Sequence, residues 1–114
     1  MSLQSIINTG KIPILLAPMA GITDLPFRNV VSKFSVDMVF SEMIAGRDLL
    51  AKNVKSQKIE LGANFLNTAV QLAGCEPKAM GEAAKLVSDL GAKAIDINMG
   101  CPAKKVVGGY SGSA

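Results

Sequence analysis

A thiol occupies a short turn near the end of the chain, where the segment NMGCP covers positions 98–102 and contains Cys101. The preceding residues 94–97 alternate in polarity and include β-branched side chains, which predicts a strand. Pro102 cannot extend that strand because proline has no backbone donor. Barrel enzymes carry their chemistry where strands end, so Cys101 is a candidate reactive group. The alternative is a buried cysteine that packs as a small apolar side chain.

Polar side chains alternate with aliphatic ones in two predicted strands, 68–72 and 94–98. In a barrel, alternate side chains face the interior and the surrounding helices. The aliphatic positions suit the helix side, and they are Val70, Leu72, Ile95, Ile97 and Met99. Gln71, Asp96 and Asn98 would then converge inside near the rim, where a ligand could satisfy them. The alternative is that Gln71 and Asp96 only hydrogen-bond each other or the backbone.

Further elements must position these residues. The continuous apolar run 12–17 is typical of a strand buried on both faces of a parallel sheet. A helix is expected from Pro26 onward, capped by Thr23 or Asp24. Its apolar stripe would consist of Phe27, Val30, Val31 and Phe34.

The rest of the chain continues this alternation. A strand is expected over 37–43, and a helix over 78–90 that ends at Gly91. Positions 47–52 carry a weak helical pattern, and positions 60–64 are interpreted as a loop. Strands and helices therefore follow one another, which predicts right-handed βα units and an α/β architecture.

Composition indicates one ordinary globular domain. The 114 residues are 49% hydrophobic, 18% charged and 4% aromatic, with a formal net charge of +3. The basic residues are scattered, so binding to nucleic acid is permitted but not indicated. Cys75 and Cys101 are too isolated for a disulfide framework or a zinc site, which favours a reducing, cytoplasmic location with no metal. Cys75 is expected to be an ordinary buried thiol.

The N-terminus lacks the charged region and apolar core of a signal peptide. The apolar stretch 12–22 is too short for a membrane span and contains two prolines. Neither export nor membrane insertion is therefore expected.

Four segments share their order and spacing with one family. They read APMAGITDLPFR at 17–28, SEM at 41–43, VQLAG at 70–74 and DINMGCPAKKV at 96–106. Together they resemble the tRNA-dihydrouridine synthases, most of all the bacterial B-type, from about Pro13 to Ala114. The resemblance implies an FMN-dependent (β/α)8 barrel followed by a small helical tRNA-binding domain. It also implies the reduction of uridine in tRNA to 5,6-dihydrouridine with NADPH.

The resemblance implies roles for single residues. Cys101 falls on the catalytic acid, and Gln71 falls on a contact to the flavin ring. Pro18, Met19 and Ala20 fall on the first flavin-contacting loop.

Other implied roles are less specific. Asn98 would help to hold the uracil ring or the flavin beside it, and Glu42 and Arg28 would shape the rim. Lys104 and Lys105 follow the catalytic turn, where they could meet a tRNA phosphate or belong to a solvated loop.

The implied chemistry explains why a thiol is needed. A hydride from the flavin to C6 of uracil leaves enolate character at C5, which Cys101 would protonate from the opposite side. A thiol with an ordinary pKa of about 8.5 is largely protonated at neutral pH. General acid catalysis of this kind contributes about 10²- to 10⁴-fold. The target base must first be flipped out of the folded RNA.

Length bounds what the chain alone could do. A complete (β/α)8 barrel needs about 250 residues, so residues 1–114 are expected to form a partial FMN-binding barrel of about four βα units. The C-terminal half-barrel and the helical tRNA-binding domain would be absent. We therefore expect weak FMN binding, no turnover by this chain alone, and self-association through exposed sheet edges.

Two alternatives remain. One is another FMN barrel oxidoreductase of the dihydroorotate dehydrogenase type, which shares an Asn-x-x-Cys-Pro-like turn. The other is a non-catalytic half-barrel that acts as a binding or assembly module. The segments APMAG and GCPAKKV favour the dihydrouridine synthases.

Overall fold

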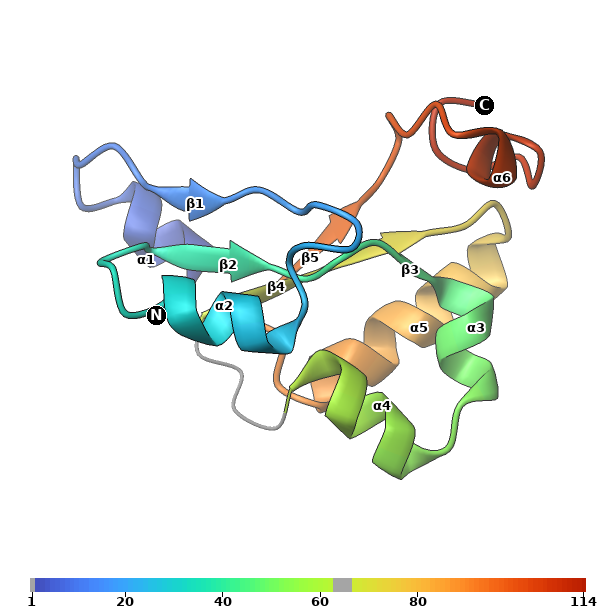
Figure 1. Cartoon of the computed structure of the whole chain (residues 1–114), viewed down its shortest axis with the longest axis horizontal. Helices are drawn as coiled ribbons and strands as arrows, with labels where there is room; N and C mark the ends of the chain where they lie inside the picture. Colours follow the sequence, from blue (N-terminus) through green and yellow to red (C-terminus); the bar gives the residue numbers. More distant parts are fainter. Residues whose placement is uncertain (1, 63–66) are drawn as a thin grey trace.

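The computed structural model describes residues 2–62 and 67–114. Its described part contains a five-stranded sheet with helices on both sides (Figure 1). The strands are β1 (Leu15–Leu16), β2 (Met38–Phe40), β3 (Ile44–Ala45), β4 (Thr68–Ala73) and β5 (Ala94–Ile97). The helices are α1 (Leu3–Ile7), α2 (Leu25–Val31), α3 (Gly46–Ala51), α4 (Val54–Leu61), α5 (Pro77–Asp89) and α6 (Lys104–Val107).

Every strand pairing is parallel, which confirms the predicted α/β architecture. β1 pairs with β2, and β4 lies between β5 on one side and both β2 and β3 on the other. The register places Gln71 beside Asp96, so their side chains lie on the same face of the sheet. The carboxyl ends of the strands therefore meet at one edge, where the predicted site residues follow them.

The strand predicted over 37–43 is wrong in extent, because β2 covers only Met38–Phe40 and β3 (Ile44–Ala45) lies just beyond the predicted range. Between the two strands, the hydroxyl of Ser41 accepts the backbone N–H of Gln71 at 3.0 Å. A side-chain oxygen thus takes the donor that a neighbouring strand carbonyl would otherwise satisfy. The ladder resumes where Ile44 pairs with Leu72.

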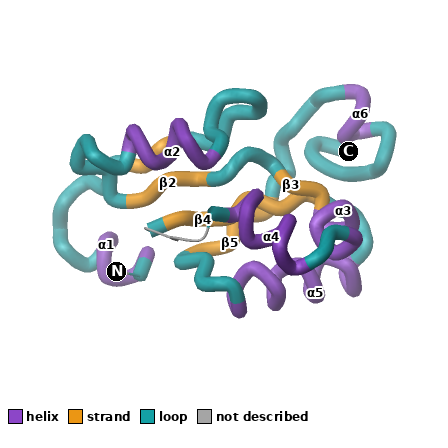
Figure 2. The backbone as a smooth tube through the Cα atoms, turned by 60° about the horizontal axis from the view of Figure 1, so that its bottom comes forward, coloured by secondary structure: helices purple, strands orange, loops and turns teal. Residues whose placement is uncertain are grey.

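The principal core lies between the sheet and helices α3, α4 and α5. Its buried members are Ile44, Leu49, Leu61, Val70, Leu72, Ala83 and Val87. Figure 2 shows these three helices gathered beside the same part of the sheet. Val70 and Leu72 therefore face the helices as strand alternation predicts, whereas Gln71 lies on the opposite face.

The opposite face of the sheet carries a smaller core. Ile6 of α1 packs there against Met38 and Ala69, and all three side chains are buried. The sequence pattern does not indicate α1, a short helix whose Ser2 cap accepts the N–H of Ser5 at 3.1 Å. A helix this short is not stable by itself and depends on tertiary packing. It is also too short for apolar periodicity to reveal it in the sequence.

The first predicted strand is wrong in extent and burial. Only Leu15–Leu16 pair as β1, and Ile12 and Ile14 are 90% and 61% exposed. Pro13 lacks the backbone donor that an earlier start of the ladder would use. The continuous apolar run thus correctly predicted that a strand is present, but its prediction that both faces of the strand are buried is wrong.

The apolar stripe predicted for the first long helix is also wrong. α2 begins at Leu25 and is capped by Asp24, whose carboxylate accepts the N–H of Phe27 at 3.0 Å. Phe27 is nevertheless exposed, and Phe34 lies beyond the helix and is 73% exposed. The buried residue of α2 is Arg28, because its guanidinium finds backbone acceptors inside the protein.

The remaining boundaries agree with prediction to within one or two residues for β4, α5 and β5. The weak helical pattern at 47–52 is confirmed as α3. The loop predicted over 60–64 is wrong at its start, because α4 extends to Leu61, and positions 63 and 64 lie outside the described residues. Among the described helices, none is long and apolar enough to cross a membrane.

Candidate active site

The turn that carries Cys101 is held by the side chain of Asn98. The Asn98 Oδ1 atom accepts the backbone N–H of Cys101 at 3.0 Å and that of Gly100 at 3.1 Å. Asparagine favours such turns because its short side chain reaches the backbone two and three residues ahead. The partly exposed Cys101 therefore follows β5 in a fixed turn, as the segment NMGCP predicts.

The three polar residues that strand alternation placed on one face do come together. Gln71 Nε2 donates to Asp96 Oδ2 at 2.5 Å, and Asn98 Nδ2 donates to Gln71 Oε1 at 3.2 Å. The Gln71 side chain is buried, with 7% of the residue exposed. The bond between Gln71 and Asp96 that the sequence allowed as an alternative is thus present. The same bonds also link Gln71 to the turn of Cys101.

Two neighbouring residues extend this network to the loop after β1. The buried Ser41 hydroxyl accepts the Gln71 N–H and donates to the carbonyl of Glu42 at 2.9 Å. The Glu42 carboxylate in turn accepts the N–H of Gly21 at 2.6 Å. Glu42 therefore joins the loops after β1 and β2.

The loop with Pro18, Met19 and Ala20 is organised by Thr23. The fully buried Thr23 hydroxyl accepts the N–H of Met19 at 3.0 Å and donates to the Met19 carbonyl at 3.2 Å. Within the described residues, no hydrogen bond joins Pro18, Met19 or Ala20 directly to Gln71. From its sequence position Thr23 was expected only as a helix cap, although a threonine hydroxyl can also bond to the backbone of a nearby loop.

Arg28 lies beneath this loop and not at its surface. Its Nη1 donates to the Thr23 carbonyl at 3.1 Å and its Nη2 to the Leu61 carbonyl at 3.2 Å. Burial lowers the pKa of Arg28, while the nearby carboxylates of Glu42 and Asp24 oppose that shift. The guanidinium still carries its charge at neutral pH. Arg28 thus supports the rim from below by joining the loop after β1 to the end of α4.

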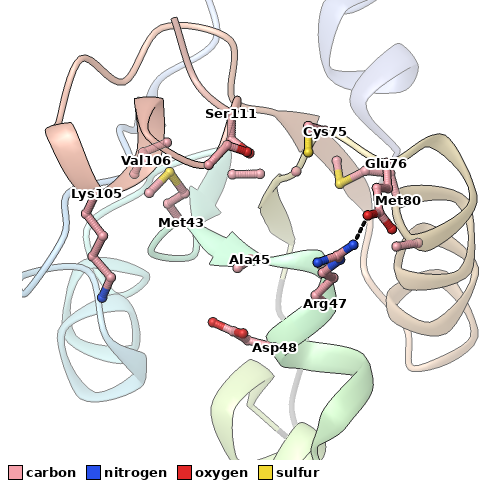
Figure 3. Close-up of a pocket in the computed structure, with 15 residues that line it drawn as sticks. Met43, Ala45, Arg47, Asp48, Cys75, Glu76, Met80, Lys105, Val106 and Ser111 are labelled. Atoms are coloured by element: carbon pink, nitrogen blue, oxygen red, sulfur yellow. Dashed lines mark hydrogen bonds and ion pairs between the residues drawn. The ribbon is translucent and has the colours of Figure 1, made fainter. Parts of the chain in front are cut away.

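A cavity of about 450 Å³ lies between the starts of α3 and α5 and the α6 segment (Figure 3). Arg47 forms an ion pair with Glu76 at its wall, and Lys105 also lines it. Cys75 lines the same cavity and is exposed, so the expectation of a buried thiol at this position is wrong. The strand has ended before Cys75, which leaves its side chain outside the core.

A second cavity of about 500 Å³ is lined by Arg28, Ser41 and Glu42 among others. Cys101 and Gln71 line neither of the two cavities. Asn98 and Gln71 are in contact outside these two cavities, and Ser41 and Glu42 join Gln71 to the loop after β1.

Comparison with known proteins gives one consistent result. Residues 15–114 match the family model described as "Dihydrouridine synthase (Dus)". The chain is 58% identical over 105 residues to "Probable tRNA-dihydrouridine synthase" of Rhodobacter capsulatus, which covers 90% of the chain and 32% of that protein.

Two further relatives agree with this match. The chain is 55% identical over 103 residues to the protein of the same name from Rickettsia bellii, covering 89% of the chain and 32% of the relative. It is 46% identical over 106 residues to "tRNA-dihydrouridine synthase B" of Pasteurella multocida, covering 89% of the chain and 31% of the relative. The chain thus spans about a third of the length of these relatives. Because the family model matches most of its residues, the chain belongs to the dihydrouridine synthase family.

Proposed function

We propose that this chain supplies the first part of the active site of a flavin-dependent tRNA-dihydrouridine synthase. The observation that carries the proposal is the turn after β5, where Asn98 holds both the backbone of Cys101 and the side chain of Gln71. A thiol is thereby kept beside an amide-rich polar surface. Family membership supports the same reaction.

In this proposal the sheet is the beginning of a (β/α)8 barrel. Its strands are all parallel, and α3 and α5 cover one face. Gln71 and Asp96 lie on the other face near the carboxyl ends of the strands, where barrel enzymes carry their sites. The chain would contribute about four βα units, in keeping with its coverage of about a third of its relatives.

Two observations favour a flavin ring at this place. Asn98 and Gln71 bring two amide side chains together beside the turn of Cys101, and amide groups suit the hydrogen-bonding edge of such a ring. Met19 has an exposed thioether for its face. We propose that Pro18, Met19, Ala20 and Gln71 hold FMN. FMN held there and reduced by NADPH would be the source of the hydride that C6 of uracil receives.

Cys101 would complete the reaction as the acid. Addition of hydride at C6 places negative charge on the C5–C4–O4 part of the uracil. The Cys101 Sγ–H bond breaks as a C5–H bond forms, which leaves a thiolate and 5,6-dihydrouridine. Asn98 would orient this step by holding the turn of Cys101. Its second Nδ2 hydrogen has no acceptor among the described residues and would donate to the uracil ring.

tRNA is the proposed substrate. The target uridine would leave its stack to reach Cys101, at a cost of a few kcal/mol. Lys104 and Lys105 are exposed directly after the turn and could bind a phosphate near the flipped base. The family match favours this substrate over the small pyrimidine used by enzymes of the dihydroorotate dehydrogenase type, and over a non-catalytic role.

A chimera tests the proposal. Residues 15–114 would replace the corresponding segment of the Rhodobacter capsulatus relative, to which the chain is 58% identical. The chimera would be incubated with tRNA, FMN and NADPH, and dihydrouridine would be measured by mass spectrometry of the nucleosides. We expect dihydrouridine to form.

The Cys101→Ala chimera is the diagnostic variant. We expect it to lose about 10²- to 10⁴-fold in dihydrouridine formation while NADPH still reduces the flavin, because only the acid is removed. A Cys75→Ala chimera is the matched control and should keep its activity. A chimera that accepts electrons from NADPH but leaves every uridine unreduced would refute the proposed function.

A further inference from the structure

The segment after α6 folds back onto Cys101. The backbone N–H of Ser113 donates to the Cys101 carbonyl at 3.1 Å, and the Ser113 hydroxyl donates to the same oxygen at 3.2 Å. In Figure 1 this last segment returns past α6 toward the end of β5. The carbonyl of the thiol-bearing residue is thus held by a serine twelve positions later in the chain.

Gly112 makes this approach possible. Its φ of +64° lies in the left-handed region that favours glycine. A Cβ atom at this position would lie 2.5 Å from the Cys101 carbonyl oxygen and 3.2 Å from the Cys101 Cβ. Any side chain at position 112 would therefore push against the backbone of Cys101.

The short helix between the two segments supplies the support. The N–H of Ser111 donates to the carbonyl of Val106 at 3.2 Å, which directs the chain back toward the turn. A Cβ at Gly112 would also lie 2.9 Å from the Val106 side chain. α6 and the loop after it therefore act as a fixed spacer between Cys101 and Ser113.

We propose that Gly112 and Ser113 are positioning residues for Cys101. Asn98 holds the N–H of Cys101 from one side, and Ser113 holds its carbonyl from the other. Together they fix both peptide groups that flank the Cα of Cys101 and so restrict where its thiol points. This inference rests on the proposed function only in taking the Cys101 thiol to be the acid.

Thiol alkylation tests the proposal on the 114-residue chain. Iodoacetamide would be added, and the rates of modification at Cys101 and Cys75 would be read separately by peptide mass spectrometry. We expect Ser113→Ala to raise the Cys101 rate by about two- to tenfold, the range that the loss of one net hydrogen bond allows. Gly112→Ala should raise it further because the turn must move.

Matched variants separate positioning from general loosening. Ser111→Ala removes a hydroxyl from the same loop that donates to Gly109 and not to Cys101. Gly109→Ala adds a Cβ that makes only an ordinary contact, 3.6 Å from the Val106 carbonyl. Both variants should leave the Cys101 alkylation rate unchanged. Ser113→Thr keeps the hydroxyl that Ser113→Ala removes, so its Cys101 rate should equal that of the parent chain. The exposed Cys75 reports reagent activity in every sample.

The outcomes decide the proposal without any activity assay. Equal Cys101 rates in the parent, Ser113→Ala and Gly112→Ala chains would overturn it, and a rise in Gly112→Ala alone would remove Ser113 from it. Circular dichroism identifies a variant that has unfolded, and the surface substitution Ser113→Ala keeps the test valid if Gly112→Ala does not fold. Because dihydrouridine formation does not enter this measurement, failure of the proposed function would be seen separately in the chimera.

Discussion

The Oδ1 atom of Asn98 lies 3.0 Å from the backbone nitrogen of Cys101, and the amide of the same side chain donates to Gln71. One asparagine therefore connects the thiol-bearing turn after β5 with the polar residue on β4. Because the two bonds use different ends of the amide, they can be broken separately by substitution.

Asn98→Ala should loosen the turn of Cys101. Two backbone N–H groups lose their acceptor, at a cost of about 0.5–1.5 kcal/mol for each bond in the free energy of unfolding. Asn98→Asp keeps the acceptor and loses the donor to Gln71. We expect fast hydrogen exchange at the amides of Gly100 and Cys101 in the first variant and slow exchange in the second. Equal exchange in both variants would contradict the role of Oδ1.

Gln71→Glu should make stability depend on pH. The new carboxylate would face Asp96, which now accepts a hydrogen bond from Gln71 at 2.5 Å. Two like charges at this distance raise the pKa of one carboxyl above its unfolded value. The variant is therefore destabilised above that pKa, and the deficit shrinks as pH falls through it.

Urea unfolding of the Gln71→Glu chain at a series of pH values between 7 and 4 measures this effect. Gln71→Leu is the neutral control, and its deficit relative to the parent should show no comparable recovery in acid. A Gln71→Glu deficit that is constant over the whole range would show that the two carboxylates do not interact.

Arg28→Met should be far more costly than Arg47→Met. Arg28 is buried and donates to the carbonyls of Thr23 and Leu61, which the variant leaves without these partners, at about 1–3 kcal/mol. Arg47 forms an ion pair with Glu76 between largely exposed side chains, which contributes about 0–1 kcal/mol. Urea midpoints of the two variants give the comparison, and similar losses would contradict a supporting role for Arg28.

The chain alone should self-associate through the open sides of its sheet. β1 and β5 are the outer strands, and Ile97 on β5 is 57% exposed. Ile97→Lys should reduce association because a charge on an outer strand opposes edge pairing. Val54→Lys, at an exposed position on α4, is the control. Sedimentation velocity measures both, and a monomeric parent chain would refute the prediction.

Local pattern was sufficient for the elements that carry the candidate site. Alternation in β4 correctly separated Val70 and Leu72 from Gln71, because side chains of a strand must point to opposite faces. In β5, Ile95 and Ile97 lie on the same face as Val70 and Leu72, but they are 37% and 57% exposed and not covered by helices as expected. The sequence pattern did not predict burial correctly where burial depends on which other element packs against the residue. The apolar residues of the first strand and of α2 are largely exposed. α1 and α6 were not predicted because they are too short to show an apolar stripe, and α4 was not predicted because it shows none.

The amino-acid sequence by itself determined the family, the βα order and the turn that presents Cys101, since motifs, periodicity and the Asn98 side chain act over short stretches of chain. Only the tertiary structure decided that Gln71 bonds to Asp96, that Thr23 and Arg28 hold the first loop, and that Ser113 reaches the Cys101 carbonyl. Most of these contacts join residues from separate elements. Hydrogen bonds are directional and short in range, so their partners are settled by how the strands register and how the loops return, which local sequence does not encode.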